Sequence, residues 1–91
     1  MAGPSKDVLI VNKRGLHARA SAKFVAAASA MEGCTVTVAK DGHEALGGSI
    51  LGLMMLGAAK GDTVTLRVEG ADANARLGEL VQLVETGFGE E

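Results

Sequence analysis

The sequence predicts a fold of the mixed α/β class, more narrowly α+β, arranged as an open-faced β-sandwich. We expect a four-stranded antiparallel sheet covered on one face by three helices, in the order β-α-β-β-α-β-α. Three observations lead to this fold. The 91 residues are 47% hydrophobic and 22% charged, which is typical of one small globular domain over residues 1–91. Several short segments alternate between apolar and polar residues, as half-buried strands do. Other segments repeat apolar residues at helical spacing.

The first part of the chain predicts a strand and then a helix. The apolar run Val8–Val11 ends at Asn12-Lys13-Arg14-Gly15, a pattern typical of a strand followed by a turn. The period then becomes helical over residues 18–31, and Gly33 is well placed to end this helix. The apolar residues that set this period are Ala20, Phe24, Ala27 and Met31.

The middle of the chain predicts a hairpin and a short helix. Thr35–Val38 alternates, with the valines on one face and the threonines on the other. Asp41-Gly42 is a typical hairpin dipeptide, so a brief strand at His43–Leu46 should pair back across it. Ser49–Leu56 then predicts a short helix, which the neighbouring glycines weaken.

The last third of the chain predicts a strand and a closing helix. Lys60-Gly61-Asp62 is a turn, and Thr63–Glu69 alternates cleanly, with its apolar residues on one face. After Gly70, one apolar stripe of a long helix comprises Ala73, Leu77, Leu80, Val81, Val84 and Phe88. Because each strand is polar on one side, we expect the helices to cover only one face of the sheet.

His17 stands at the start of the first predicted helix and is the main candidate for chemistry. Neutral imidazole is a nucleophile. The backbone N–H groups of Ala18 and Arg19 lack partners within a helix, and together with the helix dipole they favour an anion. The Arg19 guanidinium suits phosphate oxygens. These features predict a histidine that holds a phosphoryl group. From the residues alone, the simpler interpretation is that His17 is a surface helix cap and Arg19 a solvated charge.

Two motifs resemble those of a known family. Residues 15–22, Gly-Leu-His-Ala-Arg-Ala-Ser-Ala, resemble the active-site signature of the HPr phosphocarriers of the bacterial phosphotransferase system, and residues 48–56 resemble that family's regulatory-serine segment. The resemblance implies that His17 accepts a phosphoryl group from enzyme I, charged from phosphoenolpyruvate, and passes it to an enzyme IIA protein without a cofactor. The sugar-transport and nitrogen-related branches both remain open. Where the family most often has proline this chain has Ala20, which removes no functional group.

Ser49 and the helix behind it have two interpretations each. Ser49 suits a helix N-cap, and the resemblance implies phosphorylation by an HPr serine kinase/phosphorylase, a role compatible with capping. The following helix is apolar nearly all round, so it is either a loosely packed core helix or an exposed patch. We expect a docking surface for partner proteins, formed by Leu16, Ala20, Ile50, Leu51, Met54 and Met55.

Composition and spacing argue against several other classes of protein. The net charge of −2 and the absence of Trp and Tyr argue against nucleic-acid binding. His17, Cys34 and His43 lack the close spacing of metal ligands, so we expect no metal site. No glycine-rich nucleotide loop is present, so the phosphoryl group must come from another protein. The remaining alternative to a phosphocarrier is a small regulatory domain that binds a free anion at the helix start.

Cellular location follows from what the sequence lacks. The lone Cys34 fits a small buried residue at the start of a strand and a reducing compartment. The first seven residues contain no signal-peptide core, and no apolar run is long enough to cross a membrane. We therefore expect a cytoplasmic monomer with no membrane contact.

Overall fold

The structure, a computed structural model, describes residues 3–90. Met1 and Ala2, which belong to the segment where we expect no signal peptide, lie outside the described residues. Four strands form one antiparallel sheet in the spatial order β1-β4-β2-β3. The strands are β1 (Ser5–Leu9), β2 (Cys34–Lys40), β3 (His43–Leu46) and β4 (Thr63–Gly70). The helices are α1 (Ala18–Ser29), α2 (Ile50–Met55) and α3 (Ala73–Glu85), followed by the short 3₁₀ helix η1 (Gly87–Gly89). The predicted fold and element order are confirmed.

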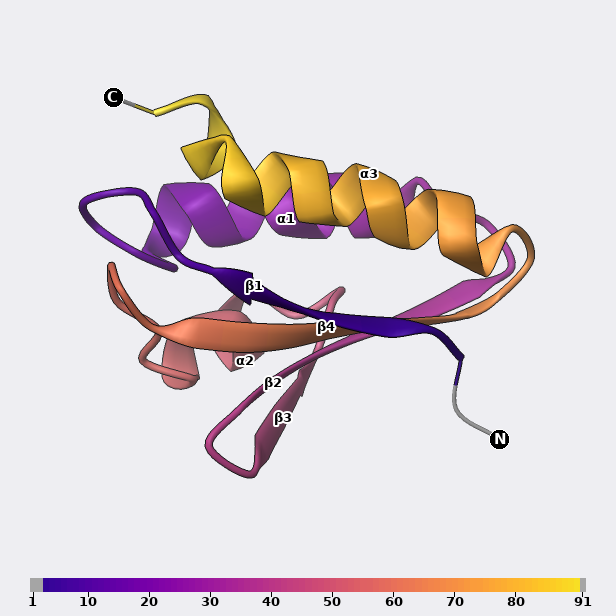
Figure 1. Ribbon diagram of the computed structural model, residues 1–91, viewed down its shortest axis with the longest axis horizontal. Helices are drawn as coiled ribbons and strands as arrows, with labels where there is room; N and C mark the ends of the chain where they lie inside the picture. The colour runs from indigo at the N-terminus through magenta and orange to yellow at the C-terminus, as the bar shows by residue number, and fades with distance from the viewer. Residues whose placement is uncertain (1–2, 91) are drawn as a thin grey trace.

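The helices bury one face of the sheet. Helices α1 and α3 lie side by side over the sheet (Figure 1), and α2 packs against α1 and β3. On the covered face Val8 pairs with Val64, and Val38 pairs with Leu66. All four side chains are almost fully buried. Burying a side chain of this size contributes about 1.5–3 kcal/mol to folding, so the apolar face seen in the sequence contributes to the stability of the sheet.

The first strand begins and ends earlier than its apolar residues predict. The sequence predicts Val8–Val11, whereas β1 covers Ser5–Leu9. Its polar first half pairs with β4, which an edge strand tolerates because its outer side faces solvent. Ile10 instead exchanges backbone hydrogen bonds of 2.8 Å with Gly61 and Asp62, beyond the end of the strand. Strand bounds follow backbone pairing, which an apolar run alone does not reveal.

The closing helix also ends before its apolar stripe does. Phe88 is predicted on the stripe of the last helix, and this prediction is wrong in detail, because α3 ends at Glu85. Gly87 and Gly89 have φ values of +66° and +74°, a region that glycine occupies without strain, and Phe88 between them has φ +59°. The Phe88 ring is nevertheless 2% exposed. The chain therefore turns back over the start of α1 while Phe88 stays in the core.

The other bounds differ by a few residues. Helix α1 stops at Ser29, two residues before the predicted Met31, and Met31 is buried in the turn that follows. Strands β2 and β4 are longer than predicted, because pairing between them continues as far as Cys34 and Gly70. Helix α2 begins at Ile50, directly after Ser49.

Candidate functional site

The loop between β1 and α1 fixes the position of His17. Gly15 has φ +61°, and a Cβ atom there would lie 2.2 Å from the carbonyl oxygen of Ala58. Only glycine allows this approach. The Leu16 N–H group donates a hydrogen bond of 2.9 Å to the same oxygen, and the buried Ser21 hydroxyl donates one of 3.2 Å to the Leu16 carbonyl. Both backbone groups of Leu16, the residue directly before His17, are thus hydrogen-bonded.

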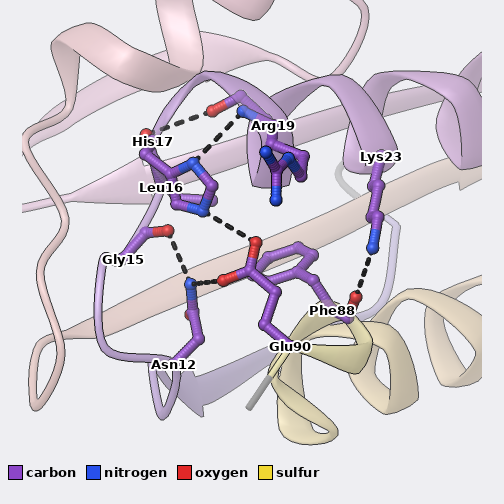
Figure 2. A network of polar contacts seen from close by, with 9 residues as sticks. Asn12, Gly15, Leu16, His17, Arg19, Lys23, Phe88 and Glu90 are labelled. Carbon is purple, nitrogen blue, oxygen red and sulfur yellow. Dashed lines mark hydrogen bonds and ion pairs between the residues drawn. The ribbon is translucent and has the colours of Figure 1, made fainter.

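His17 is the N-cap of α1, and both ring nitrogens have a partner (Figure 2). Nδ1 accepts a hydrogen bond of 3.2 Å from the Arg19 backbone N–H group. Nε2 lies 2.7 Å from Oε2 of Glu90. A backbone N–H group can only donate and a carboxylate can only accept, so this geometry assigns the proton to Nε2 and a lone pair to Nδ1. The lone pair points toward the first turn of α1.

A depression of about 390 Å³ surrounds this ring. Four cationic side chains line it beside His17 and Glu90, namely Lys13, Arg14, Arg19 and Lys23. The predicted cradle at Ala18 and Arg19 does lie in the first turn of α1, although the Arg19 N–H group is bonded to Nδ1 in this state. Four positive groups against one carboxylate favour an anionic ligand.

Glu90 is the site residue that the sequence did not reveal. Its Oε1 accepts a hydrogen bond of 3.1 Å from Nδ2 of Asn12, and that amide also donates to the Gly15 carbonyl at 2.8 Å. Partial burial favours the neutral acid, but the hydrogen bonds from Asn12 and His17 and the positive charge of Lys23 outweigh it, so the pKa of Glu90 lies below its usual value. The available signal was the Gly-Phe-Gly sequence before Glu90, which breaks the helix.

Two of the predicted docking residues face the core. Leu16 is 6% exposed and Ala20 is fully buried, so neither side chain is available to a partner and the prediction is wrong for both. Successive residues at a helix start point in different directions, and Leu16 and Ala20 point toward Phe24 in the core while His17 points outward.

The rest of the predicted patch is exposed. On α2, Leu53 is fully buried. The side chains around it are 40% to 77% exposed, and they belong to Ile50, Leu51, Met54 and Met55. The alternative of a core helix is therefore excluded. Ser49 is the N-cap of this helix, because its hydroxyl accepts a hydrogen bond of 2.9 Å from the Gly52 N–H group.

The remaining candidates lie away from this site. His43 begins β3, and Cys34 begins β2 with its thiol 3.0 Å from the Ala71 carbonyl, partly rather than fully buried. Between Gly3 and Glu90, no group of three or more His, Cys, Asp or Glu residues is placed to hold a metal ion. No helix in this described part of the chain has the length and apolar character needed to cross a membrane.

Comparison with known proteins identifies the family of this chain. Residues 4–86 match the family described as the phosphorylation site of the PTS HPr component. The phosphocarrier protein HPr of Neisseria meningitidis is 45% identical over 93% of this chain and 94% of its own. HPr of Pseudomonas aeruginosa is 41% identical over 96% of this chain and 97% of its own length. The phosphocarrier protein NPr of Shewanella violacea is 40% identical over 93% of this chain and 92% of its own length.

Solved structures give the same result. The crystal structure of HPr-C-His from Thermoanaerobacter tengcongensis has a TM-score of 0.90 and 41% identity, and covers 97% of this chain and 98% of that one. The crystal structure of HPr from Bacillus anthracis has a TM-score of 0.83 and 34% identity, and covers 89% of this chain and 95% of that one. The chain belongs to the HPr family, the phosphocarriers of the phosphotransferase system.

Proposed function

We propose that His17 is the residue that carries the phosphoryl group, which it accepts from enzyme I and passes to an enzyme IIA protein. The observation that carries this proposal is the Nδ1 lone pair of His17, held toward the first turn of α1 by the Arg19 N–H group. The lone pair attacks phosphorus, the bond from phosphorus to the donor breaks, and its electron pair stays on the donor. The reverse sequence delivers the group to the acceptor.

Arg19 and the first turn of α1 stabilise the transferred group. Once phosphorus is bonded to Nδ1, that nitrogen no longer accepts from the Arg19 N–H group, which then faces a phosphoryl oxygen. The free N–H groups of a helix start and a guanidinium both hold phosphate oxygens well. The helix can therefore exchange one acceptor for another without rearranging its backbone.

The exposed face of α2 serves as the docking surface. An apolar face is formed by Ile50, Leu51, Met54 and Met55, on a helix that packs against α1, the helix that His17 caps. Exposed apolar patches of this kind are typical of protein interaction sites. Ser49 at its start is the proposed site of regulatory phosphorylation by an HPr serine kinase/phosphorylase. In this proposal residues 1–91 act as one domain and as a monomer in the cytoplasm, where phosphoenolpyruvate charges enzyme I.

The test is phosphorylation by purified enzyme I and phosphoenolpyruvate. Intact mass should rise by about 80 Da, and the label should be lost in acid and survive alkali, as a phosphoramidate does. His17→Ala should abolish the label, and His43→Ala should keep it. Full labelling of His17→Ala would overturn the assignment. Reversible phosphate binding without any gain in mass would instead indicate a non-covalent anion-binding domain.

A further inference from the structure

We propose that Glu90 is a positioning residue for phosphoryl transfer, which holds His17 in its Nε2–H form and offsets the positive charge that the ring gains when Nδ1 bonds phosphorus. This inference rests on the proposed role of His17. The carrying observation is the 2.7 Å contact between Nε2 of His17 and Oε2 of Glu90, two residues 73 positions apart in the sequence. The same contact is seen from close by in Figure 2.

The carboxylate is held in place by contacts from three sides. Asn12, itself buried, donates to Oε1 of Glu90, while Oε2 faces His17. Two residues before Glu90, the chain is anchored by the buried ring of Phe88, whose carbonyl accepts a hydrogen bond of 2.9 Å from Lys23. Both oxygens of this carboxylate are hydrogen-bonded and its backbone is anchored. It therefore loses little further conformational entropy when it stabilises the His17 ring during transfer.

The chemistry of transfer calls for a negative group at this position. When Nδ1 of a ring protonated at Nε2 attacks phosphorus, the phosphorylated imidazole carries a positive charge shared with the Nε2–H group. The proton stays on Nε2, so the atoms and electrons balance without another reactant. A carboxylate at 2.7 Å stabilises that charge as it develops. On delivery the ring leaves as neutral imidazole, still protonated at Nε2.

Glu90 does not compete with the phosphoryl group for space. Nδ1 and Nε2 lie on different edges of the imidazole ring, and Glu90 contacts Nε2 while Nδ1 faces the Arg19 N–H group. Of the charged groups lining this depression, Lys13, Arg14, Arg19 and Lys23 are positive and Glu90 alone is negative. A phosphoryl group on Nδ1 is therefore bonded to the nitrogen that Glu90 does not contact, and the other charged groups around the ring are positive.

A glutamine cannot replace this carboxylate. Its single oxygen can face either Asn12 or His17, and in both cases its NH₂ group meets a second donor. Glu90→Gln keeps the size of the side chain and loses the charge and one acceptor. Because Glu90 lies outside the cluster of buried core residues, the variant should fold normally.

The experiment uses phosphoramidate, a small phosphoryl donor that needs no partner protein. The Nδ1–phosphorus bond forms, the phosphorus–nitrogen bond of the donor breaks, and ammonia leaves. We expect Glu90→Gln to label on the order of ten times more slowly than the wild-type protein. Glu85→Gln removes an exposed carboxylate at the end of α3 and should label at the wild-type rate. With enzyme I as donor, Glu90→Gln should lower kcat and leave KM unchanged.

A spectroscopic measurement separates positioning from a merely structural role. The charge-assisted hydrogen bond should give the wild-type His17 Nε2–H proton a downfield resonance in ¹H–¹⁵N spectra, absent from Glu90→Gln and present in Glu85→Gln. If His17 is labelled and Glu90→Gln matches the wild type in both rate and spectrum, the inference about Glu90 is wrong and the proposed function stands. If His17→Ala labels as well as the wild type, the proposed function itself fails.

Discussion

Lys23 Nζ donates a hydrogen bond of 2.9 Å to the carbonyl oxygen of Phe88, and this contact joins the middle of α1 to the C-terminal turn (residues 87–90). The two residues are 65 positions apart in the sequence. The contact matters because the C-terminal turn is the segment that places Glu90 beside His17.

Replacing Lys23 should loosen the C-terminal turn without unfolding the protein. Lys23→Met keeps the aliphatic stem and removes the donor, so the free energy of unfolding should fall by about 0.5–1.5 kcal/mol. The amides of Gly89 and Glu90, which bond to Thr86 and Gly87, should exchange with solvent faster. Hydrogen exchange followed by NMR measures this effect. Lys60→Met, in an exposed turn, is the control and should leave those amides unchanged.

Phe88 should contribute strongly to stability although it lies outside the regular helices. Its ring is buried, so Phe88→Ala should reduce the free energy of unfolding by about 3–5 kcal/mol, measured by urea denaturation. Leu46→Ala removes a side chain that is 62% exposed and should cost far less. Equal losses for the two variants would show that the Phe88 ring contributes no more than a surface residue.

Arg19 should act on transfer and not on folding. An exposed guanidinium adds only about 0–1 kcal/mol to stability, so the melting temperature of Arg19→Ala should stay close to the wild-type value. The rate of phosphoryl transfer from enzyme I should fall about tenfold or more, equivalent to about 1.4 kcal/mol of lost stabilisation. Arg76→Ala, at a half-exposed position on α3 away from His17, is the control. A sharp fall in melting temperature with an unchanged transfer rate would assign Arg19 a structural role.

Charge placed on α2 should weaken docking and leave His17 reactive. Ile50→Glu and Met54→Glu should raise the KM for enzyme I about tenfold, since a desolvated charge in an apolar interface costs at least 1.4 kcal/mol, or about one tenfold step in affinity. Labelling by phosphoramidate should not change. Leu9→Glu, at an exposed position on β1, is the control. An unchanged KM in both α2 variants would place the docking surface elsewhere.

Two substitutions of Ser49 distinguish the effect of losing the helix cap from the effect of adding a negative charge. Ser49→Ala removes the hydroxyl that accepts from Gly52 and should cost about 1 kcal/mol of stability without raising KM. Ser49→Asp keeps an acceptor at the helix start and should preserve stability while raising the KM for enzyme I. Steady-state kinetics together with thermal unfolding distinguish the two effects. A rise in KM for Ser49→Ala equal to that of Ser49→Asp would attribute regulation to helix geometry rather than to charge.

The pH dependence of stability should report the contacts of Glu90. The pKa of its carboxyl is lowered from 4.5 in the folded protein, so between that value and the folded pKa the unfolded chain binds more protons. The stability contributed by ionised Glu90 is thus complete above about pH 4.5 and is lost as the pH falls through the folded pKa. Urea denaturation over this range should show the advantage of the wild type over Glu90→Gln shrinking on acidification. The difference in free energy of unfolding between the wild type and Glu85→Gln should not change over the same pH range.

Local patterns in the sequence determined the order of the elements and the place of His17. Alternation and helical spacing report which face of each segment is apolar, and that information is contained in a few neighbouring residues. They predicted the hairpin strand at His43–Leu46 with its exact bounds and the cap at Ser49. The motif around His17 likewise placed it at the start of α1.

Only the tertiary structure decided which side chains meet at the site. Glu90 reaches His17 because two glycines adopt positive φ values and the Phe88 ring fills the core, and no local pattern contains the distance between residues so far apart in sequence. The same limit explains the error at Leu16 and Ala20, which are neighbours of His17 in sequence but point into the core. Periodicity determines the face of an element, whereas the packing of elements against one another determines contacts across the fold.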